Sequence, residues 1–327
     1  MNVAVIGAGY WGKNLVRNFS ALSALKAICE PDAAQAAALA KTYPGVTIAA
    51  LDAVLADPEI CAVAIATPAA THGALARAAL EAGKHVFVEK PLCLDLDEAR
   101  TLGALAKNRG LVLMVGHMLL YHPAYVALRD AVRDGRIGAL RYIYSTRLSL
   151  GKIRREENAL WSFAPHDISM ILNLTGRLPD RVVANGEAFL SPGVADTSLS
   201  HLSFGQGLQA HIFVSWLHPF KDQRLVVVGS EGMIVFDDVQ PGESKLRFYR
   251  HVVGWDGDLP SINKAEAEPL PYGTDEPLNA ECRHFLSCVE REATPVSDAE
   301  EGIRVLQVLD ACQRSLSSKQ PVALQVP

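Results

Sequence analysis

The 327-residue sequence lacks the features that mark several large classes of protein. It has no apolar run near the ~20 residues of a membrane-spanning helix. Its first residues show neither the basic region nor the apolar region of a secretory signal. It has no excess of basic charge, because 31 basic and 36 acidic side chains give a net charge of −5. We therefore expect a cytoplasmic protein with no membrane partner and no nucleic-acid partner.

Cysteine is scarce and shows no pairing pattern. None of the six cysteines is spaced from another by two residues, and most lie in apolar segments, so we expect reduced thiols. Two clusters contain metal-ligating residue types, His201 with His211 and Cys282 with His284 and Cys288. The first has no third ligand in view, although its histidines are expected to face each other across a hairpin. In the second only His284 and Cys288 share a helical face, so we expect no metal.

The chain does contain a glycine motif in an informative setting. The apolar, β-branched run Val3–Ile6 predicts a buried strand, and the apolar spacing over 13–22 predicts a helix. Gly7, Gly9 and Gly12 lie between them. Gly7 permits a tight turn, Gly9 leaves room for a pyrophosphate, and Gly12 allows close helix–strand packing. This order predicts a dinucleotide site at the start of the helix.

The second predicted strand, Leu25–Cys29, ends at Glu30, near the offset of ~20 residues expected for the acid that holds the adenosine ribose. A 2′-phosphate ~4 Å from this carboxylate would cost up to ~4 kcal/mol at an effective dielectric near 20. No arginine follows Glu30 to offset that cost; the next residues are Pro31, Asp32 and Ala33. The sequence favours NAD over NADP. A βαβ unit without a ligand is the alternative.

Strands and helices alternate through residues 1–120, which predicts an α/β Rossmann domain with a doubly wound parallel sheet. After Glu30 the expected helices lie near 33–41, 71–81 and 97–108, and the expected strands near 46–48, 61–66, 86–88 and 111–115. In such a sheet, ligands bind at the carboxyl ends of the strands.

The pattern changes after residue 120, where a helix over 123–134 is followed by strands with no helices between them. The expected strands lie near 140–149, 181–189, 197–204, 208–216, 223–229, 232–237 and 245–251. Residues 121–327 therefore predict an α+β domain with an open-faced, mainly antiparallel sheet. We expect 252–278 to be loop and helices near 279–291 and 299–317. A second copy is expected to cover the open face, giving a homodimer or homotetramer.

Three loops at predicted strand ends are expected to border the cofactor: Thr67-Pro68, Glu89-Lys90-Pro91 and Gly116-His117. Lys90 is the most informative residue, because strand ends beside a nicotinamide are mostly apolar or small. Its ammonium group can hydrogen-bond a substrate oxygen and favour alkoxide character. The alternative is a surface lysine that happens to follow a strand.

A second candidate lies in the stretch Trp161 to Ile168. Pro165 suits a first helical turn, which would place His166 near a helix start. There the helix dipole disfavours the imidazolium, and a neutral imidazole is what a general base needs. Asp167 is expected to orient the ring or cap the helix. The alternative is a core or capping histidine.

These motifs together resemble the Gfo/Idh/MocA oxidoreductase family over essentially the whole chain. The matching segments are Gly7-x-Gly9-x-x-Gly12, Ala66-Thr67-Pro68 with Thr71-His72, Ala82 to Pro91, Gly135-Arg-Ile-Gly138, Pro165-His166-Asp167 and the late Phe285 helix. The resemblance implies a Rossmann domain, an open-faced sheet domain and interconversion of a secondary alcohol and a ketone with NAD(P). It also implies that Lys90 and His166 are the catalytic pair.

We expect the remaining site residues to fall into two sets. Besides the glycines and Glu30, the cofactor set is Tyr10, Trp11, Thr67, Pro68, His72, Glu89 and Lys90. The substrate set is Lys90, His117, Arg147, Arg154, Trp161, His166 and Asp167. Many family members carry an aspartate four residues before the catalytic histidine, where this chain has Ser162. That departure leaves the proton relay and the direction of the reaction open.

The substrate is the least constrained prediction. Lys152, Arg154 and Arg155 precede the His166 helix and can grip a diphosphate or carboxylate, which favours a nucleotide sugar. The alternative is a solvated segment, since Glu156 and Glu157 follow. A free polyol such as an inositol, a lyase or glycosidase that retains NAD and oxidises transiently, and a non-catalytic NAD sensor stay open.

Overall fold

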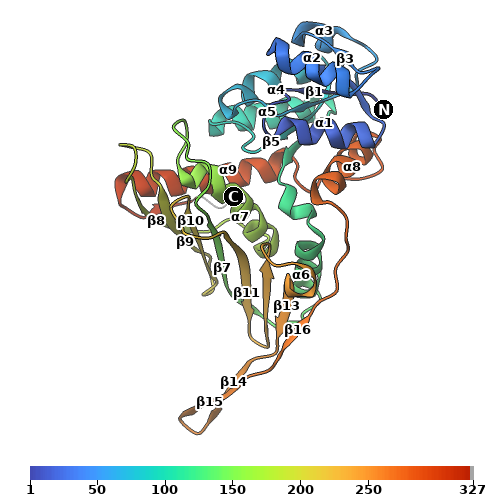
Figure 1. The fold of residues 1–327 in the computed structure, drawn as a ribbon. Coiled ribbons are helices and arrows are strands. Elements are labelled where there is room, and N and C mark those ends of the chain that lie inside the picture. Colours follow the sequence, from blue (N-terminus) through green and yellow to red (C-terminus); the bar gives the residue numbers. More distant parts are fainter. Residues whose placement is uncertain (325–327) are drawn as a thin grey trace. The chain divides into compact units, whose positions relative to one another are not determined.

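The computed structural model describes residues 1–324 and divides the chain into two compact units (Figure 1). The first unit is Met1–Tyr121 with Asp275–Leu306, and the second is His122–Thr274 with Gln307–Pro327. The predicted boundary at residue 120 assigned residues 275–306 to the second domain, whereas in the structure they pack in the first unit. Each unit is described by itself below.

The first unit contains the predicted doubly wound sheet. Its strands are β1 (Val3–Ile6), β2 (Leu25–Cys29), β3 (Thr47–Ile48), β4 (Ala62–Ile65), β5 (His85–Glu89) and β6 (Leu113–Gly116). All neighbours are parallel in the order β3-β2-β1-β4-β5-β6, which confirms the expected fold class. The order reverses between β1 and β4, the point where such sheets bind ligands at their carboxyl ends.

The helices of this unit follow the predicted apolar spacing closely. They are α1 (Gly12–Ala21), α2 (Ala33–Thr42), α3 (Leu51–Ala56), α4 (His72–Glu81), α5 (Leu96–Arg109) and α8 (Pro277–Val289), with short 3-10 turns η1 (Ala69–Thr71) and η2 (Met118–Tyr121). Helix α9 (Ala299–Ser318) begins in this unit and ends in the second. The short α3 was not predicted, because only one of its residues, Val54, is buried.

Helix α8 belongs to the first unit because its apolar face completes that core. Phe285 is fully buried, and its ring meets Phe19 of α1 and Phe87 of β5 edge-on at centroid distances of 6.3 and 5.7 Å. Leu278 and Cys282 join the same cluster. About 150 residues of sequence separate α8 from the rest of this core, so local patterns could not assign it.

The same helix buries an acid beneath the sheet. Glu281 is fully buried, and neither of its carboxylate oxygens has a hydrogen-bond partner among the described residues. Burial raises the pKa of Glu281 well above its usual value, and the nearby carboxylates of Glu89 and Glu301 raise it further. The fold therefore favours the protonated form of Glu281.

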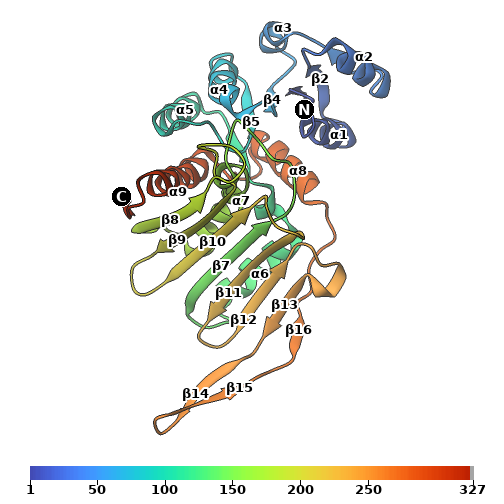
Figure 2. The same ribbon diagram turned by 60° about the vertical axis from the view of Figure 1, so that its left-hand side comes forward.

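The second unit contains a nine-stranded sheet in the order β16-β13-β12-β11-β7-β10-β9-β8-β17 (Figure 2). Its strands are β7 (Leu140–Leu148), β8 (Arg181–Glu187), β9 (Thr197–Ser203), β10 (Gln209–Ser215), β11 (Asp222–Gly229), β12 (Met233–Asp237), β13 (Leu246–Tyr249), β16 (Ala267–Pro269) and β17 (Val322–Ala323). Only the β7–β10 pair is parallel, so the mainly antiparallel sheet is confirmed.

Helices α6 (Pro123–Arg133) and α7 (Ala159–Thr175) lie against one face of this sheet (Figure 2). Strand β7 buries Ile143, Ser145 and Arg147 on that side, while Tyr142 and Tyr144 alternate to the other side and are only partly buried. None of the helices within 1–324 covers this second face. The predicted open-faced sheet is therefore present.

The prediction that 252–278 is loop was wrong. The segment contains a separate two-stranded sheet, β14 (Val252–Asp256) with β15 (Leu259–Asn263), followed by β16 and the start of α8. Charge and proline masked a short alternation of apolar residues, and Gly257, with φ of +59°, makes the turn between the strands. A 3-10 turn, η3 (Gly242–Ser244), precedes β13.

Within the described part of the chain, no helix combines the length and the apolar character that crossing a bilayer requires.

We expect Phe285→Ala to destabilise the first unit by about 3–5 kcal/mol, because it removes a fully buried ring at the contact of α8, α1 and β5. Chemical denaturation followed by tryptophan fluorescence would measure the loss. Arg283→Ala, at an exposed position of the same helix, is the control and is expected to change stability by less than about 0.5 kcal/mol. Equal effects of the two variants would contradict the assignment of α8 to this core.

A second prediction concerns the dependence of stability on pH. Because the pKa of Glu281 is raised in the folded state, its carboxyl favours folding fully below its unfolded pKa, and this contribution is lost as pH rises toward the folded pKa. Glu281→Gln removes that loss. The melting temperature of this variant minus that of the native protein should therefore increase steadily as pH rises above about 5.

Glu276→Gln, on the residue that precedes α8, is the matched control. Arg17 holds the pKa of Glu276 below its usual value. Glu276→Gln should therefore lose stability relative to the native protein as pH rises through the range in which Glu276 loses its proton, which is the opposite trend. Thermal melts from pH 4 to pH 9 would compare the two variants. A pH-independent difference for Glu281→Gln would show that the buried acid is not kept neutral.

Candidate functional site

The glycine turn has the geometry that its three glycines predict. Gly7 has φ of +82°, in the left-handed region that favours glycine. A Cβ on Gly12 would lie 2.0 Å from the carbonyl oxygen of Gly7, so α1 packs directly on the turn after β1. Gly9 has nothing within 4 Å of the place where its Cβ would be, and it is exposed. The open space above Gly9 fits a pyrophosphate group.

The N-terminus of α1 has the features of an anion-binding site. Trp11 is at its N-cap, and within the described residues no side chain caps the helix and no acid lies in its first turn. Backbone N–H groups at such a start carry partial positive charge and favour phosphate. The residues of the turn therefore fit the pyrophosphate of a dinucleotide cofactor.

Glu30 is fixed beside the same turn. Its carboxylate accepts hydrogen bonds from the backbone N–H of Ala8, at 2.9 Å, and of Asp32, at 3.0 Å. Both oxygens keep acceptor capacity, because a carboxylate has about four lone-pair sites. The side chain is only partly buried. It is thus a fixed negative charge at the end of β2, in the position predicted for a ribose ligand.

Trp11 and Glu89 connect the glycine turn to the end of β5. The Trp11 indole N–H donates to the Glu89 carboxylate, which also accepts the Lys90 backbone N–H at 3.3 Å. Burial raises the pKa of Glu89, and these donors oppose the rise. Tyr10, in contrast, is 81% exposed. Glu89 therefore links two loops as part of the scaffold immediately before Lys90.

His72 connects two other loops. Its Nδ1 lies 2.8 Å from the carbonyl oxygen of Pro91, and its Nε2 lies 2.9 Å from that of Thr67. The ring is 1% exposed, so it is buried between the ends of β4 and β5. Of the predicted cofactor residues, His72 has a position that fits a support for the Lys90 loop better than a direct ligand.

Lys90 follows the end of β5 and is partly exposed, and its peptide bond to Pro91 is cis. His117 follows the end of β6 but is 1% exposed, and its Nδ1 lies 2.6 Å from the carboxylate of Glu301. Thus the three predicted loops do lie at neighbouring strand ends, since β4, β5 and β6 are adjacent and parallel. Among them, Lys90 is partly exposed and His117 is buried.

In the second unit, the prediction that Pro165 opens a helix was wrong. Helix α7 begins at Ala159, where the side chain of Asn158 accepts the backbone N–H of Trp161 at 3.1 Å, and Pro165 lies inside it. The buried residues on both sides of Pro165 stabilise the helix against the missing N–H. His166 is therefore in the middle of α7, too far from its start for the dipole to act on the ring.

Asp167 lies inside α7 and does not cap it. Its carboxylate accepts hydrogen bonds from Arg147 Nε at 2.9 Å, Arg147 Nη2 at 3.1 Å and Ser145 Oγ at 2.5 Å. Arg147 is 8% exposed and Asp167 fully buried. Both were predicted to bind substrate, but their charges join α7 to β7. His166 is the neighbour of Asp167 along the helix and is only partly buried.

The remaining predicted substrate residues lie around the start of α7. The Trp161 indole N–H donates to Gln313 at 3.1 Å, and Arg154 pairs with Glu157 at 3.1 Å while its side chain stays 39% exposed. Ser162, one turn before His166, is buried. A serine there brings no negative charge to the face that carries His166.

The two clusters that could suggest a metal do not form one. His201 and His211 are opposite each other across the β9–β10 pair, as predicted, and His284 lies 3.4 Å from Cys288 on one helical face. Within the described residues, no group of three or more histidine, cysteine or acidic side chains could hold a metal ion.

Sequence reasoning missed the acids beneath the first unit's strand ends, Glu281 and Glu301. Neither lies in a recognisable motif, and each meets its neighbours only through the folded chain. A weak signal existed for Glu281, which occupies the same helical face as the apolar residues Leu278, Cys282 and Phe285.

Comparison with known proteins gives a consistent result. Residues 1–117 match an oxidoreductase family with an NAD-binding Rossmann fold, and residues 125–235 match the Gfo/Idh/MocA C-terminal domain. A UDP-N-acetylglucosamine 3-dehydrogenase from Acidithiobacillus ferrooxidans is 31% identical over 94% of this chain and 94% of its own length. An inositol 2-dehydrogenase from Rhizobium meliloti is 28% identical over 98% of each chain.

Solved structures agree with these sequence relationships. The structure of the Acidithiobacillus enzyme has a TM-score of 0.85 at 28% identity and covers 97% of this chain and 98% of its own. An oxidoreductase from Magnetospirillum magnetotacticum has a TM-score of 0.83 at 35% identity, covering 95% and 99%. The protein is accordingly an oxidoreductase that uses a nicotinamide cofactor on CH–OH groups. The chain belongs to the Gfo/Idh/MocA oxidoreductase family.

Proposed function

We propose that this enzyme interconverts a secondary alcohol and a ketone on a nucleotide sugar, with NAD as cofactor. The observation that carries the choice of cofactor is the Glu30 carboxylate, held beside the glycine turn by two backbone N–H groups. The choice of substrate is supported by the 31% identity to a UDP-N-acetylglucosamine 3-dehydrogenase and by the cations Lys152, Arg154 and Arg155 before α7.

In this proposal Lys90 and His166 act on one substrate hydroxyl. The Lys90 ammonium donates a hydrogen bond to the hydroxyl oxygen and stabilises the negative charge that develops there. His166 accepts the proton of the same hydroxyl, and returns it in the reductive direction. The nicotinamide, when bound, supplies the hydride acceptor or donor. Glu89 and His72 position Lys90 through the loop contacts described above.

Ser162 affects this step indirectly. It lies one helical turn before His166, where it adds no charge that would hold the protonated imidazole. Asp167 does not replace that charge, because Arg147 and Ser145 occupy its carboxylate.

A free polyol is the second candidate, favoured by the 28% identity to an inositol 2-dehydrogenase over 98% of this chain. Arg154 separates the two candidates. Its side chain is 39% exposed and lies in the loop that leads to α7, so it can contact a diphosphate, which an inositol lacks.

The first test is a screen of purified enzyme with NAD or NADH against UDP-sugars, their 3-keto derivatives and inositols, followed by absorbance of NADH. We expect turnover of nucleotide sugars, and a KM at least about tenfold higher in Arg154→Ala. Turnover of inositols alone, unaffected by Arg154→Ala, would favour the polyol function. Bond cleavage without net NADH would instead favour a lyase or glycosidase that retains NAD.

We expect Lys90→Ala and His166→Ala each to lower kcat by about 10²–10⁴, because each removes a group that acts on the reacting hydroxyl. NAD binding, measured by calorimetric titration, should stay within a factor of a few of the native value. Lys107→Ala, an exposed lysine of α5, is the control and should keep full turnover. Near-native turnover in either site variant would refute its assigned role, and NAD binding without turnover on any substrate would favour a sensor.

Cofactor choice is tested separately by Glu30→Gln. The native enzyme should prefer NAD, because a 2′-phosphate beside the Glu30 carboxylate costs up to about 4 kcal/mol. The amide keeps an acceptor for the Ala8 N–H but removes the charge, so the preference in kcat/KM for NAD over NADP should narrow by at least about tenfold. Glu59→Gln, an exposed acid paired with Lys26, should leave the preference unchanged. Equal use of both cofactors by the native enzyme would contradict the proposal.

We also propose that a second copy of the chain covers the open face of the second unit's sheet. This face carries Tyr142, Tyr144, His211 and Val235, a mixture of aromatic, histidine and apolar side chains that are only partly buried. Such a surface is typical of a protein interface. The experiments of the next subsection include the measurement of oligomeric state that tests it.

A further inference from the structure

The hairpin of β14 and β15 has one apolar face. Val253 pairs with Ile262, and Trp255 pairs with Pro260, so the four side chains lie on the same side of the two strands. Val253, Trp255 and Ile262 are 61%, 71% and 67% exposed. The opposite side carries Gly254 with Ser261, and Asp256 with Leu259 near the turn. The alternation of side chains along the two strands therefore gives the hairpin an apolar stripe that is exposed to solvent in the single chain.

A hairpin of this kind is poorly stabilised by its own chain. It forms a sheet separate from the nine-stranded one, and it extends beyond the β13–β16 pair in both views (Figures 1 and 2). Isolated two-stranded sheets are marginally stable in water. Each strand of five residues spans about 17 Å, long enough to cross three or four strands of another sheet. The hairpin thus has the form of an arm that needs a surface.

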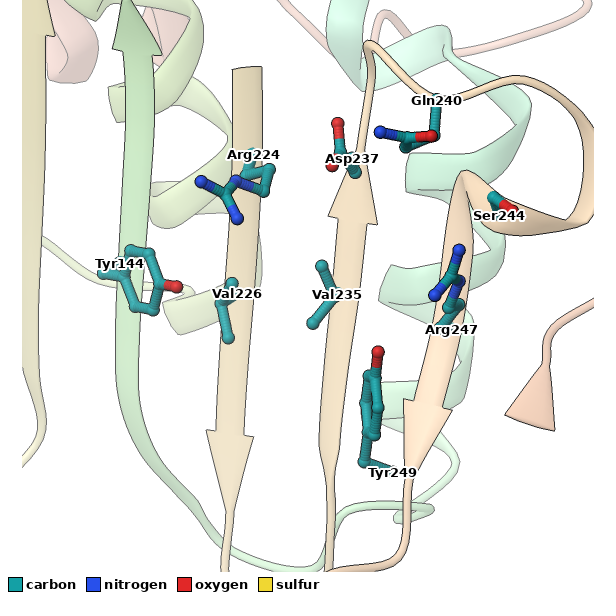
Figure 3. Close-up of a pocket in the computed structure, with 9 residues that line it drawn as sticks. All are labelled: Tyr144, Arg224, Val226, Val235, Asp237, Gln240, Ser244, Arg247 and Tyr249. Atoms are coloured by element: carbon teal, nitrogen blue, oxygen red, sulfur yellow. The ribbon is translucent and has the colours of Figure 1, made fainter. Parts of the chain in front are cut away.

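A matching surface lies on the open face of the same sheet (Figure 3). A hollow of about 340 Å³ is lined by Tyr144, Arg224, Val226, Val235, Asp237, Gln240, Ser244, Arg247 and Tyr249. The Arg224 guanidinium pairs with the Asp222 carboxylate, whereas Arg247 has no carboxylate partner among the ion pairs of the described residues, so Arg247 is the cation offered to an incoming acid. A neighbouring hollow of about 230 Å³ adds Phe220 and Val239, which are 63% and 40% exposed.

The tip of the hairpin has the complementary charge. Asp256 and Asp258 flank Gly257 at the turn, and both are exposed. Leu259 beside them is 72% exposed. An acidic tip next to an apolar stripe matches a hollow with arginines beside exposed apolar side chains.

We propose that the β14–β15 hairpin is an arm that docks on the open sheet face of a second copy of this chain. Its apolar stripe covers the two hollows, and Asp258 at its tip approaches Arg247. One chain carries both the arm and the receiving surface, so a twofold axis satisfies both at once. The proposal extends the association through the open face to a named contact, and it does not depend on which substrate is used.

The first test places a photoreactive benzoylphenylalanine at position 255 of the full chain. A mixture of ¹⁵N-labelled and unlabelled chains is irradiated, and crosslinked peptides are identified by mass. We expect crosslinks between chains that join position 255 to residues within 220–249. Crosslinks confined to one chain, or made only to other proteins in a cell extract, would overturn the proposal.

The second test compares Trp255→Glu with Ser261→Glu by analytical ultracentrifugation. The two variants add the same charge to opposite faces of the arm. Trp255→Glu should raise the dissociation constant of the dimer at least about tenfold, whereas Ser261→Glu should leave it nearly unchanged. Equal effects, or a native protein that stays monomeric, would refute arm docking.

A third test reverses the charges of two residues to determine which residue of the partner the hairpin tip contacts. Asp258→Lys and Arg247→Glu should each weaken the dimer, and the double variant should recover most of the loss. Additive losses would place the tip elsewhere and contradict the contact with Arg247. Turnover and NAD binding are measured on the same samples. Loss of activity on every sugar with intact dimers would count against the proposed function alone.

Discussion

The close approach of α1 to the turn after β1 is the contact on which the first unit's site depends. A Cβ at position 12 would lie 2.0 Å from the Gly7 carbonyl oxygen, so only glycine permits this contact without a shift of the backbone. The approach brings the uncapped helix start to the carboxyl end of β1. It also brings the Ala8 N–H to Glu30 and the Trp11 indole to Glu89. One steric constraint therefore places the phosphate donors, the ribose acid and the support of Lys90 together.

These contacts join side chains and backbone groups of different βα units. Burial strengthens each hydrogen bond but raises the free energy of any ionised group that is buried with it. His72 bridges the loops after β4 and β5, and Glu89 bridges the glycine turn and Lys90. Burial raises the pKa of Glu281 and of Glu89, and the carboxylates of Glu89 and Glu301 raise that of Glu281 further. The fold favours the protonated form of Glu281, and the His117 ring is the partner of Glu301. Rigid loops are obtained with few ionised groups in the interior.

Local sequence predicted most of the fold, and the failures share a physical cause. Strands such as β2 and helices such as α1 follow directly from apolar periodicity, which reports one buried face. Pro165 was misassigned because the packing of α7 outweighs the lost N–H, and packing is not visible locally. The arm was missed because its stripe faces solvent within the chain, so it carries no burial pattern. The pairing of Arg147 with Asp167 required knowing which face of β7 the helix covers.

Strand β7 shows how one sheet can serve two purposes. Its alternate residues Ser145 and Arg147 fix Asp167 of α7, and this holds the helix that carries His166. The residues that alternate with them, Tyr144 and Thr146, face the open side and pair with Val226 and Arg224 of β11. Because successive side chains of a strand point to opposite faces, substitutions on the open side can change association without disturbing the contact that places His166. Substitutions at alternate positions of β7 should therefore affect either the placement of His166 or the association of two chains, but not both.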